Sequence, residues 1–272
     1  MDAPKLLRVL LGVALSLTLI FALSACGADS TEDEEYESDP DAIATEVSTL
    51  PSIRIAALES DDLLPTKVAE SEGLFYIRGL KVDVLTFATV EEQHEAFIAG
   101  ESDALISDMA DLALLTSDEL IVYAVAVVQD DGGSKKSSLE TDNTLHRSLF
   151  TLPDDALSER VIAFSQEFLL GNAASGEQTS PEASAEAVNM FIGAVAQAVG
   201  QINSAAHDYL ELYLEQGVVA HYLYDEPVLP TYPFPELPDR EEGEALLRWL
   251  LDNDKLGRSM GYDDLIFVPI AP

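Results

Sequence analysis

The sequence is poor in basic residues. It has 14 Lys and Arg against 50 Asp and Glu, a formal net charge of −36 over 272 residues. Nucleic acids and anionic membrane surfaces repel such a chain, so we exclude both as electrostatic partners. Two interpretations of the acidity stay open. One is a solvated, self-repelling surface that suits high salt, and the other is a surface that collects cations.

Residues suited to catalysis or metal binding are also scarce. Cys26 is the only cysteine, which excludes an intramolecular disulfide and a multi-cysteine metal site. The four histidines are scattered, and none has the spacing of a zinc-binding motif. The chain has no G-x-S-x-G nucleophile elbow, no phosphate-binding loop and no G-x-G-x-x-G. We therefore predict no enzyme activity, no catalytic residue, no metal and no cofactor.

The first 25 residues have the pattern of a signal peptide. Lys5 and Arg8 precede an apolar run, residues 9–23, that is short for a membrane span. The run ends in Leu-Ser-Ala-Cys at Cys26, which resembles the bacterial lipobox. That resemblance implies cleavage before Cys26, a diacylglycerol on its thiol and a lipid-anchored chain on the extracytoplasmic face of the cell membrane. An ordinary secretory signal with a chance cysteine and an uncleaved anchor remain as alternatives.

Residues 26–50 read as a disordered tether. Residues 27–50 contain nine acidic residues and no basic one, so they bury too little apolar surface to fold. As a flexible coil this segment spans on the order of 25–30 Å, and charge repulsion extends it further. It would hold the following domain away from the membrane.

Strands alternate with helices of about ten residues between positions 51 and 128. Apolar strands are expected at 53–57, 81–87, 103–106 and 120–128. Helices are expected at 64–72, ending at Gly73, and at 90–99, ending at Gly100, with Thr89 as the N-cap of the second. This alternation predicts an α/β fold with a doubly wound, mainly parallel sheet.

Polar loops follow three of these strands, where the carboxyl ends of a parallel sheet usually bind ligands. The candidate ligand-binding residues are Glu59, Ser60, Asp61, Asp62, Phe87, Thr89, Ser107, Asp108 and Met109. Helix capping by Thr89 and Asp108 and a turn at residues 60–62 explain part of this pattern equally well. No Arg or Lys lies in the three loops, so a cationic or neutral solute is favoured over an anionic one.

Three short motifs occur in order along this region: AESEGLF at 69–75, GLKV at 79–82 and AGESDA at 99–104. Together they resemble the type 2 periplasmic binding proteins of ABC importers, in the SsuA-like branch that binds sulfonates, nitrate or thiamine precursors. The resemblance implies a periplasmic-binding-protein-like lobe over 51–128, a small-molecule solute and an ABC permease as partner. Its second lobe normally has roughly a hundred residues.

The remaining chain departs from that pattern. Residues 129–158 are polar and turn-rich, and the segment from Glu159 resembles the strand that returns to the first lobe. We therefore expect 129–158 to replace a truncated or absent second lobe, and 159–272 to complete the first. Ser180 and Pro181 open a long helix, another is expected at 205–216, and Asp239 opens the last. The proline-rich segment 225–238 is extended, either as a groove lined by Tyr232 and Phe234 or as a wrapping loop.

The sequence supports two alternative hypotheses for the function. The first is a lipid-anchored solute-binding component of an ABC-type importer. The second is a degenerate lobe that no longer transports and acts as a protein-interaction module or a sensor's accessory subunit on the cell surface. A hydrolase lacks a nucleophile or metal constellation in this sequence.

Overall fold

The structure is a computed structural model that describes residues 50–117, 120–129, 159–215 and 229–268. These lie within one compact unit, Ser48–Pro272. The signal peptide, Cys26, the tether up to residue 49 and the connection 130–158 fall outside the described residues, so the expectations for them stay predictions. Among the described helices, none combines the length and the apolar character that a membrane crossing needs.

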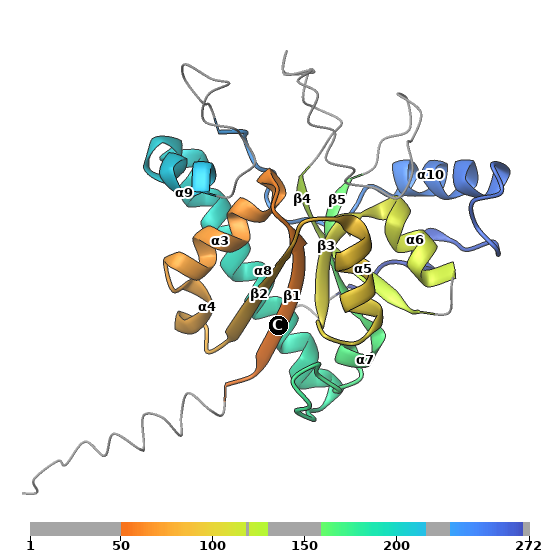
Figure 1. Ribbon diagram of the computed structural model, residues 1–272, viewed down its shortest axis with the longest axis horizontal. Helices are drawn as coiled ribbons and strands as arrows, with labels where there is room; N and C mark the ends of the chain where they lie inside the picture. Colours follow the sequence, from red (N-terminus) through yellow and green to blue (C-terminus); the bar gives the residue numbers. More distant parts are fainter. Residues whose placement is uncertain (1–49, 118–119, 130–158, 216–228, 269–272) are drawn as a thin grey trace, which may run out of the picture. The chain divides into compact units, whose positions relative to one another are not determined.

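Five strands form one sheet in the order β2-β1-β3-β5-β4 (Figure 1). Their bounds are β1 Ser52–Leu58, β2 Lys81–Phe87, β3 Ala104–Asp108, β4 Val122–Gln129 and β5 Arg160–Ser165. β1 is parallel to β2 and to β3, whereas β5 is antiparallel to both of its neighbours, β3 and β4. The sheet is therefore mixed, and the expectation of a mainly parallel sheet holds only for the pairings of β1.

The direction of β5 follows from where the chain leaves and re-enters the sheet. Gln129 at the end of β4 pairs with Arg160 at the start of β5. Arg160 also pairs with Asp108, the last residue of β3. The return strand therefore begins at the edge where the other four strands end, and it brings a basic residue to that edge.

The helices agree with the sequence pattern at their N-termini. Their bounds are α3 Leu64–Ser71, α4 Leu74–Ile77, α5 Val90–Ile98, α6 Met109–Ser117, α7 Gln166–Leu169, α8 Pro181–Ser204, α9 Leu210–Glu215 and α10 Arg240–Asp252, with short 3-10 turns at Asp61–Leu63, Ala206–Tyr209 and Tyr262–Asp264. Thr89, Ser180 and Asp239 each accept a hydrogen bond from the amide three residues later, as predicted. The helix expected at 205–216 begins instead as the 3-10 turn before α9.

Alternate residues of the central strands face two apolar cores. Ile55, Ile106 and Phe164 pack in the core that includes α3 and α8. Ala56 and Leu105 face the other side, in the core that includes α6 and α10. Figure 1 shows α3, α4 and α8 on one side of the sheet and α5, α6 and α10 on the other. Helices on both faces confirm the doubly wound α/β architecture.

Candidate functional site

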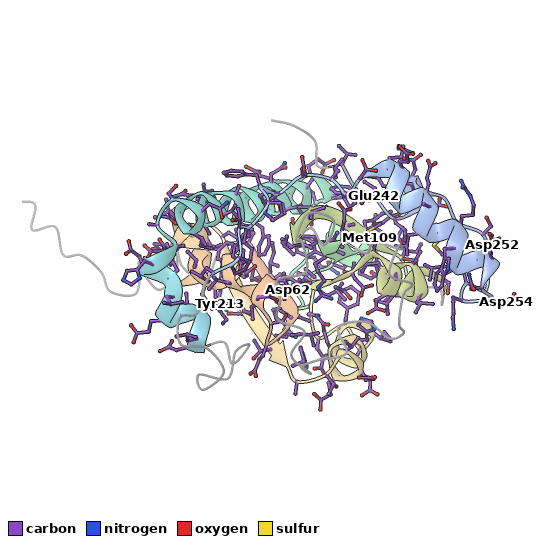
Figure 2. The ribbon with its side chains drawn as sticks, turned by 90° about the horizontal axis from the view of Figure 1, so that it is seen from above. Asp62, Met109, Tyr213, Glu242, Asp252 and Asp254 are labelled. Carbon is purple, nitrogen blue, oxygen red and sulfur yellow. The ribbon has the colours of Figure 1, made fainter. Side chains whose placement is uncertain are left out.

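Three segments converge at the edge where β1 and β3 end and β5 begins. They are the loop and 3-10 turn after β1, the junction between β3 and α6, and the start of β5. Figure 2 labels Asp62 from the first segment and Met109 from the second. The short links from strand to helix leave polar side chains and helix N-termini at this edge, which is where ligands bind in such sheets.

A buried ion pair joins the first and third segments. Arg160 Nε lies 2.5 Å from Asp62 Oδ2, and the two residues are 3% and 1% exposed. The Ser60 hydroxyl donates a hydrogen bond to the other carboxylate oxygen of Asp62. Burial lowers the pKa of Arg160, but the attraction of Asp62, Asp108 and Asp111 outweighs it and raises this pKa above its ordinary value. Arg160 is therefore a fixed positive charge.

His94 of α5 lies beside Ser107 and Asp111. Its Nε2 is 3.5 Å from the Ser107 hydroxyl and 3.9 Å from Asp111 Oδ2. Asp111 in turn donates its amide to Asp108 Oδ1 at 2.9 Å, so Asp108 caps the start of α6. Burial and then the charge of Arg160 lower the pKa of His94 from 6.5 to about 4, whereas Glu91 opposes this shift. The imidazole is neutral at pH 7.

These groups give the edge a negative character despite Arg160. Three buried acidic side chains, Asp62, Asp108 and Asp111, accompany one guanidinium, and His94 is neutral. The three loops contain no basic residue, but the sequence-based charge argument left out Arg160, which reaches them from β5. The expectation of a cationic or neutral solute therefore stays a prediction, and Arg160 weakens the charge argument for it.

The side chain of Gln93, in α5, bridges β1 and β3 beneath the site. β1 and β3 pair only at Ile55 with Ala104 and at Ala56 with Leu105. Beyond these pairs, Gln93 Nε2 donates to the carbonyls of both Ala56 and Ile106, each at 2.9 Å. The buried amide group thus satisfies two carbonyls where the strands separate, which stabilises the opening between the β1 and β3 loops.

The nine predicted ligand-binding residues divide by accessibility. Buried residues are Ser60, Asp62, Ser107, Asp108 and Met109; half-buried are Asp61 and Phe87; exposed are Glu59 and Thr89. Two of the accessible residues, Glu59 and Phe87, are neighbours, because the Glu59 amide donates to the Phe87 carbonyl at 3.4 Å. Thr89 and Asp108 act as helix caps, as the alternative interpretation required. The structure brings the three loops to the same edge of the sheet.

Sequence reasoning missed four members of the cluster, and it assigned Tyr232 to a possible groove instead. The four are Gln93, His94, Asp111 and Arg160. Tyr232, in the extended proline-rich segment, is buried and donates its hydroxyl to the Asp61 carbonyl at 2.8 Å, so this segment wraps against the site. One signal was available: Arg160 opens an otherwise apolar strand, and a charge in such a position requires a partner.

Within the described residues, no group of three or more His, Cys, Asp or Glu side chains is placed to hold a metal ion. The carboxylates of the cluster surround a guanidinium rather than one another. The chemistry that the edge offers is hydrogen bonding and charge recognition.

Comparison with solved protein structures identifies the fold of this chain. No protein-family model matches the sequence, and no curated protein matches it. Among solved structures, the aliphatic sulphonate binding protein SsuA from Escherichia coli is similar with a TM-score of 0.53 and 12% identity, over 81% of this chain and 93% of that one. The alkanesulfonate-binding protein SsuA from Xanthomonas axonopodis pv. citri, bound to MOPS, has a TM-score of 0.55 and 10% identity, over 80% and 98%.

The nitrate-binding protein NrtA from Synechocystis PCC 6803 is similar at a TM-score of 0.50 and 10% identity, over 79% of this chain and 84% of that one. The chain therefore has the fold of type 2 periplasmic binding proteins, as the three sequence motifs implied. These similar structures are binding proteins rather than enzymes. A shortened second lobe is not shown by the comparisons and stays a prediction.

Proposed function

We propose that the chain is the lipid-anchored, extracytoplasmic solute-binding component of an ABC-type importer, which binds a small organic solute and delivers it to a membrane permease. The observation that carries this proposal is the convergence of polar loops at the carboxyl edge of β1, β2 and β3 in a fold shared with sulfonate- and nitrate-binding proteins. That edge is the ligand-binding edge of doubly wound sheets in general.

Accessible and buried residues have different roles in this proposal. Glu59 and Phe87 contact the solute, because they are exposed and half-buried and are joined by a backbone hydrogen bond, and the half-buried Asp61 follows in the same loop as Glu59. Asp62 and Arg160 form the floor, because a buried ion pair fixes the loop after β1 against the start of β5. A rigid floor beneath accessible groups limits the ordering that binding requires, which favours affinity.

The solute is cationic or neutral. Glu59 and Asp61 attract an amine, and the face of the Phe87 ring attracts a cation. A sulfonate or nitrate would meet these carboxylates and the three acidic side chains of the buried cluster. If residues 129–158 replace the second lobe, much of the solute stays in contact with water, and binding is weaker than in a closed two-lobed site.

Calorimetry and a thermal-shift screen of the full chain test this function. The compounds are amines, amino acids, pyrimidines, sulfonates, nitrate and divalent metal ions. We expect a saturable rise in the unfolding temperature with amines or neutral solutes. The Glu59→Gln variant should weaken binding of an amine, and Glu95→Gln, which removes an exposed carboxylate from α5, is the matched control. Tight binding of sulfonate or nitrate would contradict the charge argument.

The anchor is tested separately. Cells that make the full chain are fractionated, and the mass of the mature protein is measured. Cleavage before Cys26 with addition of a diacylglycerol would place the protein in the membrane fraction, and Cys26→Ser would release it or leave it uncleaved. An unmodified Cys26 in a soluble, processed protein would reject the anchor but leave solute binding untouched.

A stable chain that ignores every compound in the screen favours the alternative function, a surface protein-interaction module or an accessory sensor subunit. In that case the cluster around Arg160 serves only to join the loops. Co-purification with cross-linked cell-surface proteins would then identify the partner.

A further inference from the structure

A second cavity lies at the opposite edge of the sheet from the proposed solute site. Its walls are the start of β1 at Pro51 and Ser52, one face of α8, and the loop after α7. It encloses about 510 Å³, within the range of small-molecule sites of roughly 300–1,000 Å³. β1 runs from Ser52 beside this cavity to Leu58 at the other edge, about 20 Å at the rise of a strand. The two sites are therefore separate.

The loop after α7 is firmly held in place. The buried Asp103 carboxylate accepts the amide of Ala174 at 2.5 Å and that of Arg54 at 2.7 Å, which joins this loop to β1. The Thr179 amide donates to the Gly171 carbonyl at 2.8 Å, closing the base of the loop. Gly171 has φ 98°, and a Cβ there would lie 2.3 Å from the Thr179 carbonyl oxygen. The conformation of this loop, which forms one wall of the cavity, therefore depends on Gly171 and on Asp103.

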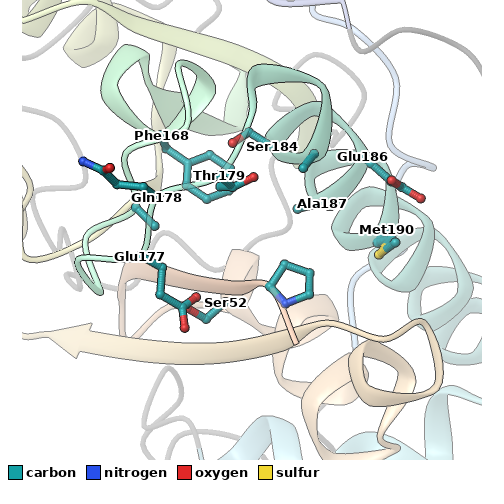
Figure 3. A pocket seen from close by; sticks show the side chains of 12 residues that line it. Ser52, Phe168, Glu177, Gln178, Thr179, Ser184, Glu186, Ala187 and Met190 are labelled. Atoms are coloured by element: carbon teal, nitrogen blue, oxygen red, sulfur yellow. The ribbon is translucent and has the colours of Figure 1, made fainter. Parts of the chain in front are cut away.

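Ser184 provides a buried polar group in the wall. It belongs to the first turns of α8 and is 2% exposed. Its hydroxyl has no hydrogen-bond partner among the residues that the structure describes. Figure 3 shows Ser184 beside Phe168, above Thr179. A buried hydroxyl without a partner costs free energy, so a ligand group that hydrogen-bonds to Ser184 would gain from it.

The rest of the lining combines an apolar centre with an acidic rim. Phe168, Ala187 and Met190 supply apolar surface, and the rim carries two exposed carboxylates, Glu177 on the loop beside Ser52 and Glu186 on α8 (Figure 3). None of the twelve lining residues is basic. The N-terminus of α8 favours an anion only weakly, as an exposed helix end does, and the carboxylate of Glu182 already lies in its first turn. Two rim carboxylates therefore decide the preference.

We propose that this cavity is a second ligand site, which takes a small amphipathic cation. The apolar part of the ligand packs on Phe168 and Met190. Its ammonium group lies at the acidic rim that Glu177 and Glu186 form, and a hydroxyl or similar polar group at its other end hydrogen-bonds to Ser184. The site does not depend on solute binding at the opposite edge or on transport.

Three probes of similar size test the proposal on the full chain by calorimetry. Tyramine has an aromatic ring, a hydroxyl and an ammonium group. Phenethylamine lacks the hydroxyl, and 4-hydroxyphenylpropionate replaces the ammonium with a carboxylate. We expect tyramine to bind best and the carboxylate worst. The difference between tyramine and phenethylamine should be about fivefold in Kd, the size of one hydrogen bond, and Ser184→Ala should abolish that difference.

Substitutions in and beside the cavity show where tyramine binds. Ala183→Phe fills the cavity from an exposed position of α8 and should abolish tyramine binding. Glu186→Gln should weaken it several-fold, whereas Glu182→Gln, on the same helix but outside the lining, should not. Circular dichroism checks that each variant folds, and Ser184→Ala gives a second readout if Ala183→Phe does not.

Three results would overturn the proposal. One is no binding of tyramine at millimolar concentration. The second is equal binding of 4-hydroxyphenylpropionate. The third is tyramine binding that survives Ala183→Phe but is lost in Glu59→Gln, which would place the ligand at the carboxyl edge of the sheet. Loss of the proposed transport function alone would leave this site unaffected.

Discussion

Arg160 and Asp62 are 98 positions apart in the sequence, and their side chains form a buried ion pair with Nε 2.5 Å from Oδ2. One residue opens β5 and the other belongs to the 3-10 turn after β1. β1 and β5 do not pair with each other, because β3 lies between them in the sheet. The ion pair therefore connects two loops across an intervening strand, and several consequences can be measured.

Removal of Arg160 should strongly destabilise the fold. Arg160→Met leaves Asp62 and its carboxylate neighbours buried without the guanidinium, at a cost of about 3–5 kcal/mol in the free energy of unfolding. Urea unfolding followed by circular dichroism measures this value. The double variant Asp62→Leu/Arg160→Met should lose less than the sum of the two single variants. Strict additivity would show that the two side chains do not interact.

His94 should make stability depend on pH. Its pKa of about 4 in the folded protein lies below 6.5, the ordinary value that it has when unfolded, so the unfolded state takes up the proton first as pH falls. The free energy of unfolding should decrease by about 2 kcal/mol between pH 7 and pH 5 because of this residue. Repulsion among the many carboxylates also changes with pH. The measurement is therefore the difference between the native chain and His94→Gln, which should have lost this slope.

Gln93 should be costly to replace with an apolar residue. Gln93→Leu leaves the carbonyls of Ala56 and Ile106 buried without their donor, and we expect a loss of about 2–4 kcal/mol. The exposed Glu95→Gln on the same helix should change stability by less than about 0.5 kcal/mol. If Gln93→Leu were as mild as this control, water would have to satisfy both carbonyls.

Asp103 should hold the loop of the second cavity. Burial raises its pKa, although the amides of Ala174 and Arg54 and the charge of Arg54 oppose this. Asp103→Asn replaces one of the two accepting carboxylate oxygens with an amide nitrogen, which cannot accept a hydrogen bond. One backbone amide is therefore left without an acceptor, and the free energy of unfolding should fall by about 1–3 kcal/mol. Hydrogen exchange at Ala174 should accelerate. The neighbouring exposed Glu101→Gln is the control, and unchanged exchange at Ala174 in Asp103→Asn would contradict this role.

The sequence by itself determined the local features. Thr89, Ser180 and Asp239 begin helices because each side chain accepts from an amide only three residues away. Gly73 and Gly100 follow α3 and α5 with positive φ, as expected from glycine alone. The boundaries of β2 agree with the apolar pattern at both ends. The three motifs also sufficed to indicate the fold, since they lie in one contiguous α/β segment.

Only the tertiary structure decided which distant residues meet. The antiparallel direction of β5 placed Arg160 among Asp62, Asp108 and Asp111, and no local pattern specifies that direction. Asp103 belongs to a sequence motif, but its partner Ala174 lies 71 positions away. Burial likewise separated the accessible Glu59 and Phe87 from the enclosed Asp62. Local hydrogen bonds are encoded within a few residues, whereas charge pairing and burial depend on the order of strands in the folded sheet.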